Sequence, residues 1–292
     1  MLIHKIEKTH FSPSESIIID YILKKGKDIK NMTIAQIANE TYTSSPLFIR
    51  IAKKLGFDGW NEFKEAYLKE LDYLYLNQEV DANIPFVVND DIMNIAYNLC
   101  VLERETIQDT YSLISHDDLQ KAVQIIRKAS SIYVFAVSNN GLISQEFAHN
   151  MSRIQKKVTI CHLQGELVYS AMNAEPHSCA IIVSYSGETP ILSRVIQALK
   201  ANGIPIIALT NIGENTVSKH ADVVLRICTR EKLYSKIATF STDISFEYIL
   251  DLLYSCIFAL NYDQNVERKT KISSMIEKGR FSTIDIMKED EF

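Results

Sequence analysis

The carboxy-terminal two thirds of the chain alternates short apolar runs of strand length with helical stretches. Such continuous apolar strands, separated by helices, are typical of a parallel sheet that is covered on both faces. The sequence therefore predicts an α/β domain with five parallel strands. The expected strands cover Ile132–Val137, Val158–Cys161, the run 179–183, Ile204–Thr210 and Val223–Cys228.

Three longer stretches of this region have helical periodicity: Asp90–Leu113, Asp118–Ala129 and about Ser241–Leu260. The last is apolar on most of its sides. A helix of this kind is buried either in the core of its own chain or in a subunit interface. Its apolar area around Ile249 to Phe258 makes it our expected source of a homodimer or homotetramer interface.

The amino-terminal part predicts a group of short helices. Ser12-Pro13-Ser14-Glu15 and Thr33-Ile34-Ala35-Gln36 are capping-box patterns, and Ser45-Pro46 begins a third helix that stops at Gly56. Two short helices joined by about four residues form a helix-turn-helix. The alternative is that the helical hairpin is only part of a small core.

A further helix, Trp60 to Leu76, precedes residues without periodicity that include Pro85. We therefore expect a helix-turn-helix domain at 1–76, a linker at 77–89, the α/β domain at 90–265 and a helical, acidic tail at 266–292.

Composition agrees with two domains in an intracellular protein. The chain has 292 residues, of which 47% are hydrophobic, and a formal net charge of -5. Residues 1–56 nevertheless hold nine Lys and Arg against five Asp and Glu, a local excess that suits contact with DNA phosphates. No signal peptide or membrane-spanning run is present, and five cysteines without a Cys-x-x-Cys pair favour a reducing cytoplasm. The pattern indicates no metal site and no cofactor.

One hexapeptide carries the strongest chemical signal. Ser184-Tyr185-Ser186-Gly187-Glu188-Thr189 follows an apolar strand and leads into an amphipathic helix, with Thr189 as N-cap and Pro190 as first helical residue. Hydroxyls beside the positive end of a helix dipole suit a phosphate group. The loop lacks a Walker lysine, so nucleotide hydrolysis is not indicated. The alternative is that these residues only cap the helix and permit a turn.

This region, roughly residues 107 to 262, resembles the sugar isomerase (SIS) domain, a flavodoxin-like fold that binds phosphosugars. The family pattern Ser-x-Ser-Gly-x-Thr is matched by Ser184, Ser186, Gly187 and Thr189. The first family motif, Gly-x-Gly-x-Ser, departs here to Ala136-Val137-Ser138-Asn139-Asn140, where Asn140 takes the place of the serine. The resemblance implies phosphosugar binding by Ser138, Asn140, Ser184, Ser186, Gly187 and Thr189.

Residues 34–60 resemble the helix-turn-helix of RpiR-type bacterial regulators. The resemblance rests on Ile34-Ala35-Gln36-Ile37-Ala38, on Ser44-Ser45-Pro46-Leu47-Phe48-Ile49-Arg50 and on the Leu55-Gly56-Phe57 segment. A carboxy-terminal SIS domain is also typical of that family. Together the two resemblances imply a regulator that binds double-stranded operator DNA and responds to a sugar phosphate.

By position, Ser44, Ser45 and Leu47 would lie where side chains reach base edges, with Arg50 one turn further along. Lys53 and Lys54 are expected to contact DNA phosphates. The alternative for Arg50 is an ion pair with a neighbouring acid.

Two other classes of function remain open. SIS domains also serve isomerases, whose proton transfer needs a carboxylate or imidazole. Glu166, Glu188, Glu231 and His220 are the candidates near predicted loops, but none lies in a catalytic pattern, so we assign no catalytic residue. A pure interaction scaffold would leave the hydroxyls of the 184–189 loop without a role.

Overall fold

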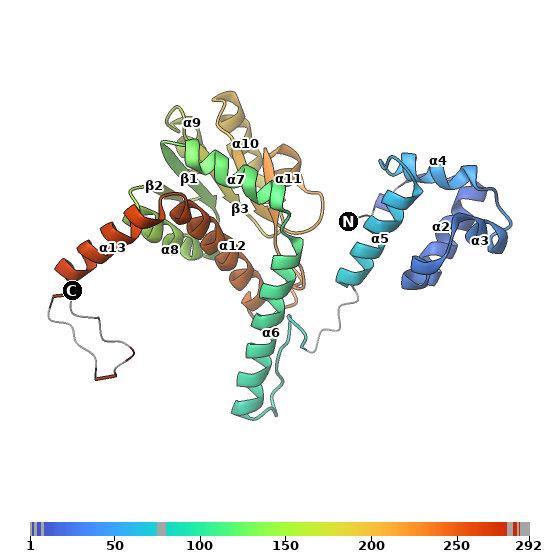
Figure 1. The fold of residues 1–292 in the computed structure, drawn as a ribbon, viewed down its shortest axis with the longest axis horizontal. Helices are drawn as coiled ribbons and strands as arrows, with labels where there is room; N and C mark the ends of the chain where they lie inside the picture. Colours follow the sequence, from blue (N-terminus) through green and yellow to red (C-terminus); the bar gives the residue numbers. More distant parts are fainter. Residues whose placement is uncertain are drawn as a thin grey trace. The chain divides into compact units, whose positions relative to one another are not determined.

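The computed structural model describes residues 2, 5–6, 9–74, 80–278, 283–284 and 286. The chain divides into two compact units, Met1–Asp81 and Ala82–Phe292. Each is described by itself below (Figure 1).

The amino-terminal unit is helical. Its elements are α2 (Pro13–Lys25), the short 3-10 helix η1 (Gly26–Asn31), α3 (Ile34–Glu40), α4 (Pro46–Lys54) and α5 (Trp60–Leu74). Apolar side chains from all of them form one core, in which Phe48 meets Trp60 edge to face with ring centroids 4.7 Å apart. The expected helices are present, and α5 is described to Leu74; residues 75–79 lie outside the described residues.

The second unit is an α/β domain with an all-parallel sheet in the order β2-β1-β3-β4-β5. The prediction of five parallel strands is confirmed, with ends that shift by one or two residues. The strands are β1 (Ser131–Ala136), β2 (Lys157–Cys161), β3 (Cys179–Val183), β4 (Ile206–Thr210) and β5 (Val223–Arg226). The helices are α6 (Ile92–Leu113), α7 (His116–Lys128), α8 (Asn139–Arg153), α9 (Leu167–Met172), α10 (Pro190–Ala201), α11 (Thr216–His220), α12 (Phe240–Ala259) and α13 (Tyr262–Ile276).

Helices cover both faces of the sheet, because alternate residues of each buried strand point to opposite sides. On β3, Ile181 and Val183 face a core shared with α7, α8 and α12. Ala180 and Ile182 face a second core shared with α9, α10 and α11 (Figure 1).

Helix α12 lies in the core of its own chain. Ile249, Leu250, Leu253 and Ile257 are buried among the strands and α7 and α8. The core alternative therefore holds for these four residues, and their side chains are not available to a partner subunit. A long apolar run does not reveal which surface covers it.

The segment expected to be a linker contacts the α/β domain at Asn83. The Lys232 N–H donates to Asn83 Oδ1 at 2.6 Å, and the Ile237 N–H donates to the Asn83 carbonyl at 3.0 Å. Residues 77–79 of that segment, and residues 287–292 of the expected acidic tail, lie outside the described residues.

Candidate functional site

The sheet order places the loops after β1 and β3 next to each other. These neighbouring strands lead to helices on opposite faces of the sheet: α8 packs in the core with α12, and α10 packs in the core with α9. In open α/β sheets, ligands bind in the crevice at such a switch point, outside the carboxyl ends of the strands. The two loops that the sequence singled out are thus brought to one edge of the sheet.

The loop after β3 is compact and rich in hydroxyls. Ser184 Oγ accepts the Gly187 N–H at 3.2 Å and lies 3.4 Å from Thr189 Oγ1, while Ser186 Oγ accepts the Glu188 N–H at 3.2 Å. Gly187 has φ +66°, a conformation that side-chain-bearing residues rarely adopt. The loop therefore depends on glycine at this position.

Two asparagines of the loop after β4 hold the loop after β3. Asn211 Nδ2 donates to the carbonyls of Tyr185 (2.7 Å) and Ser186 (3.1 Å). The side chain of Asn215 lies directly over Gly187, where a Cβ atom would come within 2.1 Å of its Cγ. The Asn211 carbonyl in turn accepts from Arg226 Nη1 at 2.7 Å. Residues after β4 and on β5 thus fix the geometry of the loop after β3.

Helix α10 begins as the sequence predicts. Thr189 is the N-cap with extended backbone, and Pro190 is the first helical residue. Thr189 makes no capping hydrogen bond with its side chain, so its hydroxyl remains with that of Ser184. The first N–H groups of a helix have no intrahelical acceptor, and the helix dipole adds positive potential there. The loop can therefore hold a phosphate group.

The loop after β1 contains a strained residue. Ser138 has φ +56° and ψ −133° and is exposed, so the backbone takes a glycine-type conformation with a serine in place. Asn140 Nδ2 donates to the Val183 carbonyl at 3.3 Å, which ties this loop to the end of β3. The amide of Asn140, expected to bind a sugar hydroxyl, thus also has a structural partner.

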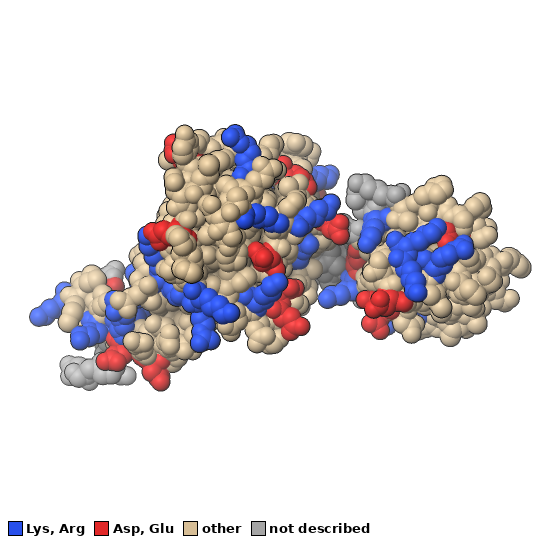
Figure 2. Space-filling view, turned by 90° about the horizontal axis from the view of Figure 1, so that it is seen from above, with Lys and Arg blue, Asp and Glu red and all other residues tan. Residues whose placement is uncertain are grey.

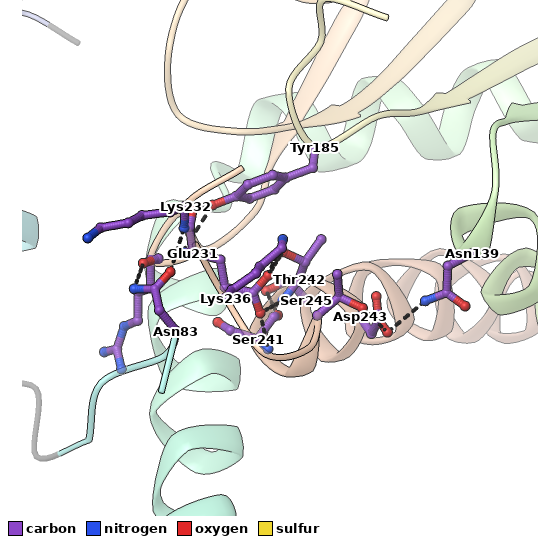
Figure 3. A network of polar contacts seen from close by, with 12 residues as sticks. Asn83, Asn139, Tyr185, Glu231, Lys232, Lys236, Ser241, Thr242, Asp243 and Ser245 are labelled. Atoms are coloured by element: carbon purple, nitrogen blue, oxygen red, sulfur yellow. Dashed lines mark hydrogen bonds and ion pairs between the residues drawn. The ribbon is translucent and has the colours of Figure 1, made fainter. Parts of the chain in front are cut away.

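A network of polar contacts lies beside these loops, at the start of α12 (Figure 3). Glu231, whose side chain has no exposed surface, accepts the N–H groups of Ser241 and Thr242 at 2.7 and 3.0 Å and pairs with Lys236 at 2.8 Å. Tyr185 donates its hydroxyl to the Glu231 carbonyl at 2.6 Å. Burial, followed by the nearby Glu231 charge, raises the pKa of Tyr185 well above its ordinary value.

Asp243 connects α12 to the loop after β1. Its Oδ2 accepts from Asn139 Nδ2 and from Thr239 Oγ1, both at 2.7 Å. Its Oδ1 is buried and has no hydrogen-bond partner among the described residues. Burial raises the pKa of Asp243 above its ordinary value. A buried carboxylate oxygen without a donor is uncommon in folded proteins, and its burial keeps it out of direct reach of a ligand in this structure.

Three of the four candidate groups of the isomerase alternative, Glu188, Glu231 and His220, have side-chain partners within the chain. Glu188 accepts from the N–H and hydroxyl of Thr216 at 2.8 and 2.5 Å, and these hydrogen bonds lower its pKa. Glu231 caps α12 as described. His220 Nδ1 lies 2.8 Å from the Thr216 carbonyl, and Glu166 is an exposed residue at the start of α9. The contacts of Glu188, Glu231 and His220 favour structural roles for these three residues.

The amino-terminal unit contains the expected pair of short helices, α3 and α4, joined by residues 41–45. Thr33 accepts the Gln36 N–H at 3.3 Å and the Gln36 side chain accepts the Thr33 N–H at 2.7 Å, which completes one capping box. At the other, Glu15 accepts the Ser12 N–H at 2.8 Å, but Ser12 Oγ has no partner among the described residues.

Glu15 is the centre of a charge cluster that the capping-box pattern did not reveal. Its side chain has no exposed surface, and it pairs with Arg50 Nε at 2.7 Å and Lys54 Nζ at 2.6 Å. Burial by itself raises the pKa of Glu15, but the hydrogen bonds from Lys54, the Ser12 N–H and Arg50 outweigh it and lower the pKa to about 2. Arg50 thus makes the ion pair considered as its alternative role, while 57% of its side chain stays exposed.

The other residues expected to face DNA differ in exposure. Ser44, Ser45 and Lys53 are exposed, whereas Leu47 is partly buried against the core of the unit. Lys and Arg side chains gather on one face of the amino-terminal unit, with acidic side chains beside them (Figure 2). A mixed basic face of this kind suits modest, salt-sensitive contact with phosphates.

Membrane-spanning helices and metal-binding clusters are both absent from the described part of the chain. No helix there is long and apolar enough to cross a bilayer. No three His, Cys, Asp or Glu side chains there are grouped so that they could hold a metal ion.

Both domains of the chain match known protein families. Residues 2–72 match the helix-turn-helix domain of the rpiR family, and residues 125–244 match the SIS domain. An uncharacterized HTH-type transcriptional regulator of Caldanaerobacter subterraneus subsp. tengcongensis is 26% identical over 271 residues, which are 91% of this chain and 93% of the relative.

Two solved structures share the fold. The NanR protein of Vibrio vulnificus, complexed with ManNAc-6P, has a TM-score of 0.58 and 21% identity over 94% of this chain and 96% of that one. The sugar isomerase domain of an RpiR transcription factor from Sphaerobacter thermophilus has a TM-score of 0.53 and 18% identity over 63% of this chain and 98% of that one. This chain, with its two matched domains in that order, belongs to the RpiR family of helix-turn-helix transcriptional regulators with a SIS domain.

Proposed function

We propose that this protein is a cytoplasmic regulator whose affinity for operator DNA is set by a sugar phosphate bound at the edge of its α/β sheet. The observation that carries the proposal is the loop after β3. There the hydroxyls of Ser184, Ser186 and Thr189 gather at the start of α10, on a chain that also carries a helix-turn-helix.

The phosphate is held by this loop, with Gly187 permitting close approach of the backbone. Hydrogen bonds to a charged group contribute about 1.5 to 3 kcal/mol each. Ser138 and Asn140 lie across the switch point on the neighbouring loop, and we assign them to the sugar. Because the NanR structure contains ManNAc-6P, acetamido sugar phosphates belong among the first effectors to test.

The DNA contacts come from α4 and the turn before it. Ser44 and Ser45 reach base edges from the amino end of the recognition helix, together with Leu47, and Lys53 contacts a phosphate. Arg50 and Lys54 direct their charged groups both to DNA and to Glu15. A single helix-turn-helix reads only a few base pairs, so the protein acts as a homodimer or homotetramer on a roughly twofold site.

Calorimetry with the full-length protein tests the effector half of the proposal. A panel of hexose and amino-sugar phosphates, ManNAc-6P included, is compared with the same sugars without phosphate. We expect binding of at least one phosphate and of none of the free sugars. Ser186→Ala should weaken that binding about 10- to 150-fold, whereas Ser193→Ala, further along α10, should not. Equal affinity for the free sugar would contradict the phosphate site.

Gel shifts with operator and random duplex test the regulatory half. The sugar phosphate should change operator affinity by roughly 5- to 150-fold, the usual range of coupling between two sites. Ser186→Ala should retain basal operator binding and lose this response. If the bound sugar phosphate is instead converted to an isomer, as followed by NMR, the isomerase alternative is favoured.

A further inference from the structure

The first half of α6 leaves an unpartnered apolar face. The second half of this helix packs on α12, where Thr106 and Thr110 bond to Ser241 and Ser245 at 2.8 and 3.2 Å. The first half extends beyond the rest of the domain (Figure 1). The segment 84–100, here called the α6 arm, exposes six large apolar side chains: Ile84, Val87, Val88, Ile92, Met93 and Tyr97.

The exposed residues of the helical part of the arm share one side. At about 100° per residue, Ile92, Met93, Ala96, Tyr97 and Cys100 fall within one face of roughly 140°. Ile92 is 81% exposed and Tyr97 63%. Monomeric proteins rarely leave a continuous apolar face of this kind in water.

Helix α13 has a second uncovered apolar surface. Residues 260–276 expose Leu260, Tyr262, Val266, Ile272, Met275 and Ile276, with Ile276 77% exposed. Helix α13 and the α6 arm leave the domain in different directions (Figure 1). Within one chain, the arm and α13 therefore do not cover each other.

Area and charge both favour a second copy of the chain as the occupant. Twelve large apolar side chains, each with on the order of 100 Å² exposed, exceed the roughly 800 Å² that each partner buries in a stable interface. The arm carries Asp90 and Asp91 and no Lys or Arg, whereas residues 260–278 carry four basic residues against three acidic ones. The two surfaces are thus apolar with opposite net charge.

We propose that two copies of this chain form a twofold dimer in which the α6 arm of each packs on α13 of the other. Twofold symmetry repeats the contact, so each chain buries both surfaces. The inference rests on the part of the proposed function that requires two helix-turn-helix units. The interface is then formed by the α6 arm and α13, and not by α12 as the sequence suggested.

Sedimentation of the full-length protein tests the surface. The wild type should be a dimer at micromolar concentration, or a tetramer built from such dimers. Tyr97→Glu and Met275→Glu should each raise the dissociation constant of the dimer at least about 30-fold, the effect of losing one central interface residue. Tyr169→Glu, which charges an equally exposed side chain on α9 (66%), is the matched control and should not. A monomeric wild type, or dimers that survive both changes, would overturn the proposal.

A cross-linking experiment tests the same interface if a charged variant fails to fold. Cys100 is exposed on the arm. A second cysteine at Val266→Cys or Ile272→Cys should yield a dimer with a short bismaleimide, and Cys100→Ser should prevent it. Absence of a cross-linked dimer in both variants counts against the arrangement.

The same samples separate this inference from the effector proposal. A monomeric Tyr97→Glu protein that still binds the sugar phosphate supports both. Failure of every sugar phosphate to bind an intact dimer would contradict the effector proposal alone.

Discussion

Arg50 Nε lies 2.7 Å from Oε1 of Glu15, a carboxylate that has no exposed surface. The pair joins the middle of α4, the proposed recognition helix, to the first turn of α2, and Lys54 binds the other oxygen of the same carboxylate. The orientation of α4 therefore depends on charge as well as on its apolar side. Two residues that the sequence assigns to DNA are also held by an acid of their own unit.

Glu15→Gln should destabilise the amino-terminal unit, because it removes the charge from two hydrogen bonds. The expected loss is about 1.5 to 3 kcal/mol of unfolding free energy at pH 7. The folded-state pKa of Glu15 is lowered to about 2 from 4.5. Its stabilisation is thus complete above about pH 4.5 and is lost as the pH falls towards 2. The unfolding free energy of the Glu15→Gln variant should therefore change less than that of the wild type between pH 4.5 and 2.

Tryptophan fluorescence can report on the unfolding of this unit alone. The chain contains one tryptophan, Trp60, which is 3% exposed in the core of this unit. Urea unfolding followed by its fluorescence at a series of pH values gives the profile. Glu40→Gln is the control, because Glu40 is half exposed and lies 3.8 Å from Lys25. If both variants behave alike, the buried cluster does not hold α4.

Lys53→Ala should weaken operator and random DNA alike. Lys53 is exposed on α4, so we expect one phosphate contact and a fall of about 0.9 in the slope of log affinity against log salt. Lys24→Ala removes the same charge from α2 and should leave the slope nearly unchanged. Gel shifts at several salt concentrations measure it. Loss of operator affinity alone would assign Lys53 to base contact instead.

The sequence predicted the strands well, because each buried strand is a continuous apolar run such as Cys179–Val183. The short helices α9 and α11 were missed, since five or six residues are too few for a helical period to appear. The apolar pattern indicated that the strands are parallel, but it carried no information about their order in the sheet.

The candidate site was only half visible in the sequence. The hydroxyls of the 184–189 loop lie in one motif, but the residues that hold the loop come from elsewhere. Asn211 reaches it from the loop after β4, Glu231 contacts Tyr185 from the loop after β5, and Asp243 bonds to Asn139 across 104 positions. Single asparagines and acids in loops carry no periodic signal. Only the fold brings them together.

Gly187→Ala should distort the loop after β3. An alanine Cβ there lies 2.1 Å from Asn215 Cγ, so either the loop or Asn215 must move. Gly203→Ala is a matched control, because Gly203 has the same φ of +66° but no atom within 4 Å of the added Cβ. Both variants should lose about 1 to 2 kcal/mol to the left-handed conformation. Gly187→Ala should lose a further 1 to 3 kcal/mol to overpacking.

The ligand response separates these two variants again. Gly203→Ala should keep the rise in melting temperature caused by the sugar phosphate, and Gly187→Ala should lose it, because the hydroxyls of Ser184 and Ser186 shift. Thermal unfolding with and without ligand measures both effects. Equal stability and equal response in the two variants would show that Asn215 does not constrain the loop.

Ser138→Gly should stabilise the α/β domain, although it removes a side chain. Ser138 has φ +56° and ψ −133°, a conformation that costs an L-residue about 1 to 3 kcal/mol. Glycine relieves this strain but makes the unfolded chain more flexible, which costs about 0.4 to 1 kcal/mol. The net expectation is a gain of roughly 1 kcal/mol in unfolding free energy, measured by urea unfolding and circular dichroism.

Ser138→Ala isolates the two roles of this residue. It removes the hydroxyl and keeps the strain, and the hydroxyl makes no capping bond in the structure, so its stability should equal that of the wild type. If the hydroxyl contacts the sugar phosphate, alanine and glycine should weaken binding to a similar degree, because both lack it. Should alanine stabilise the domain as much as glycine, the strain at Ser138 would not be the cause. Should only glycine weaken binding, the loop geometry and not the hydroxyl would be what the ligand requires.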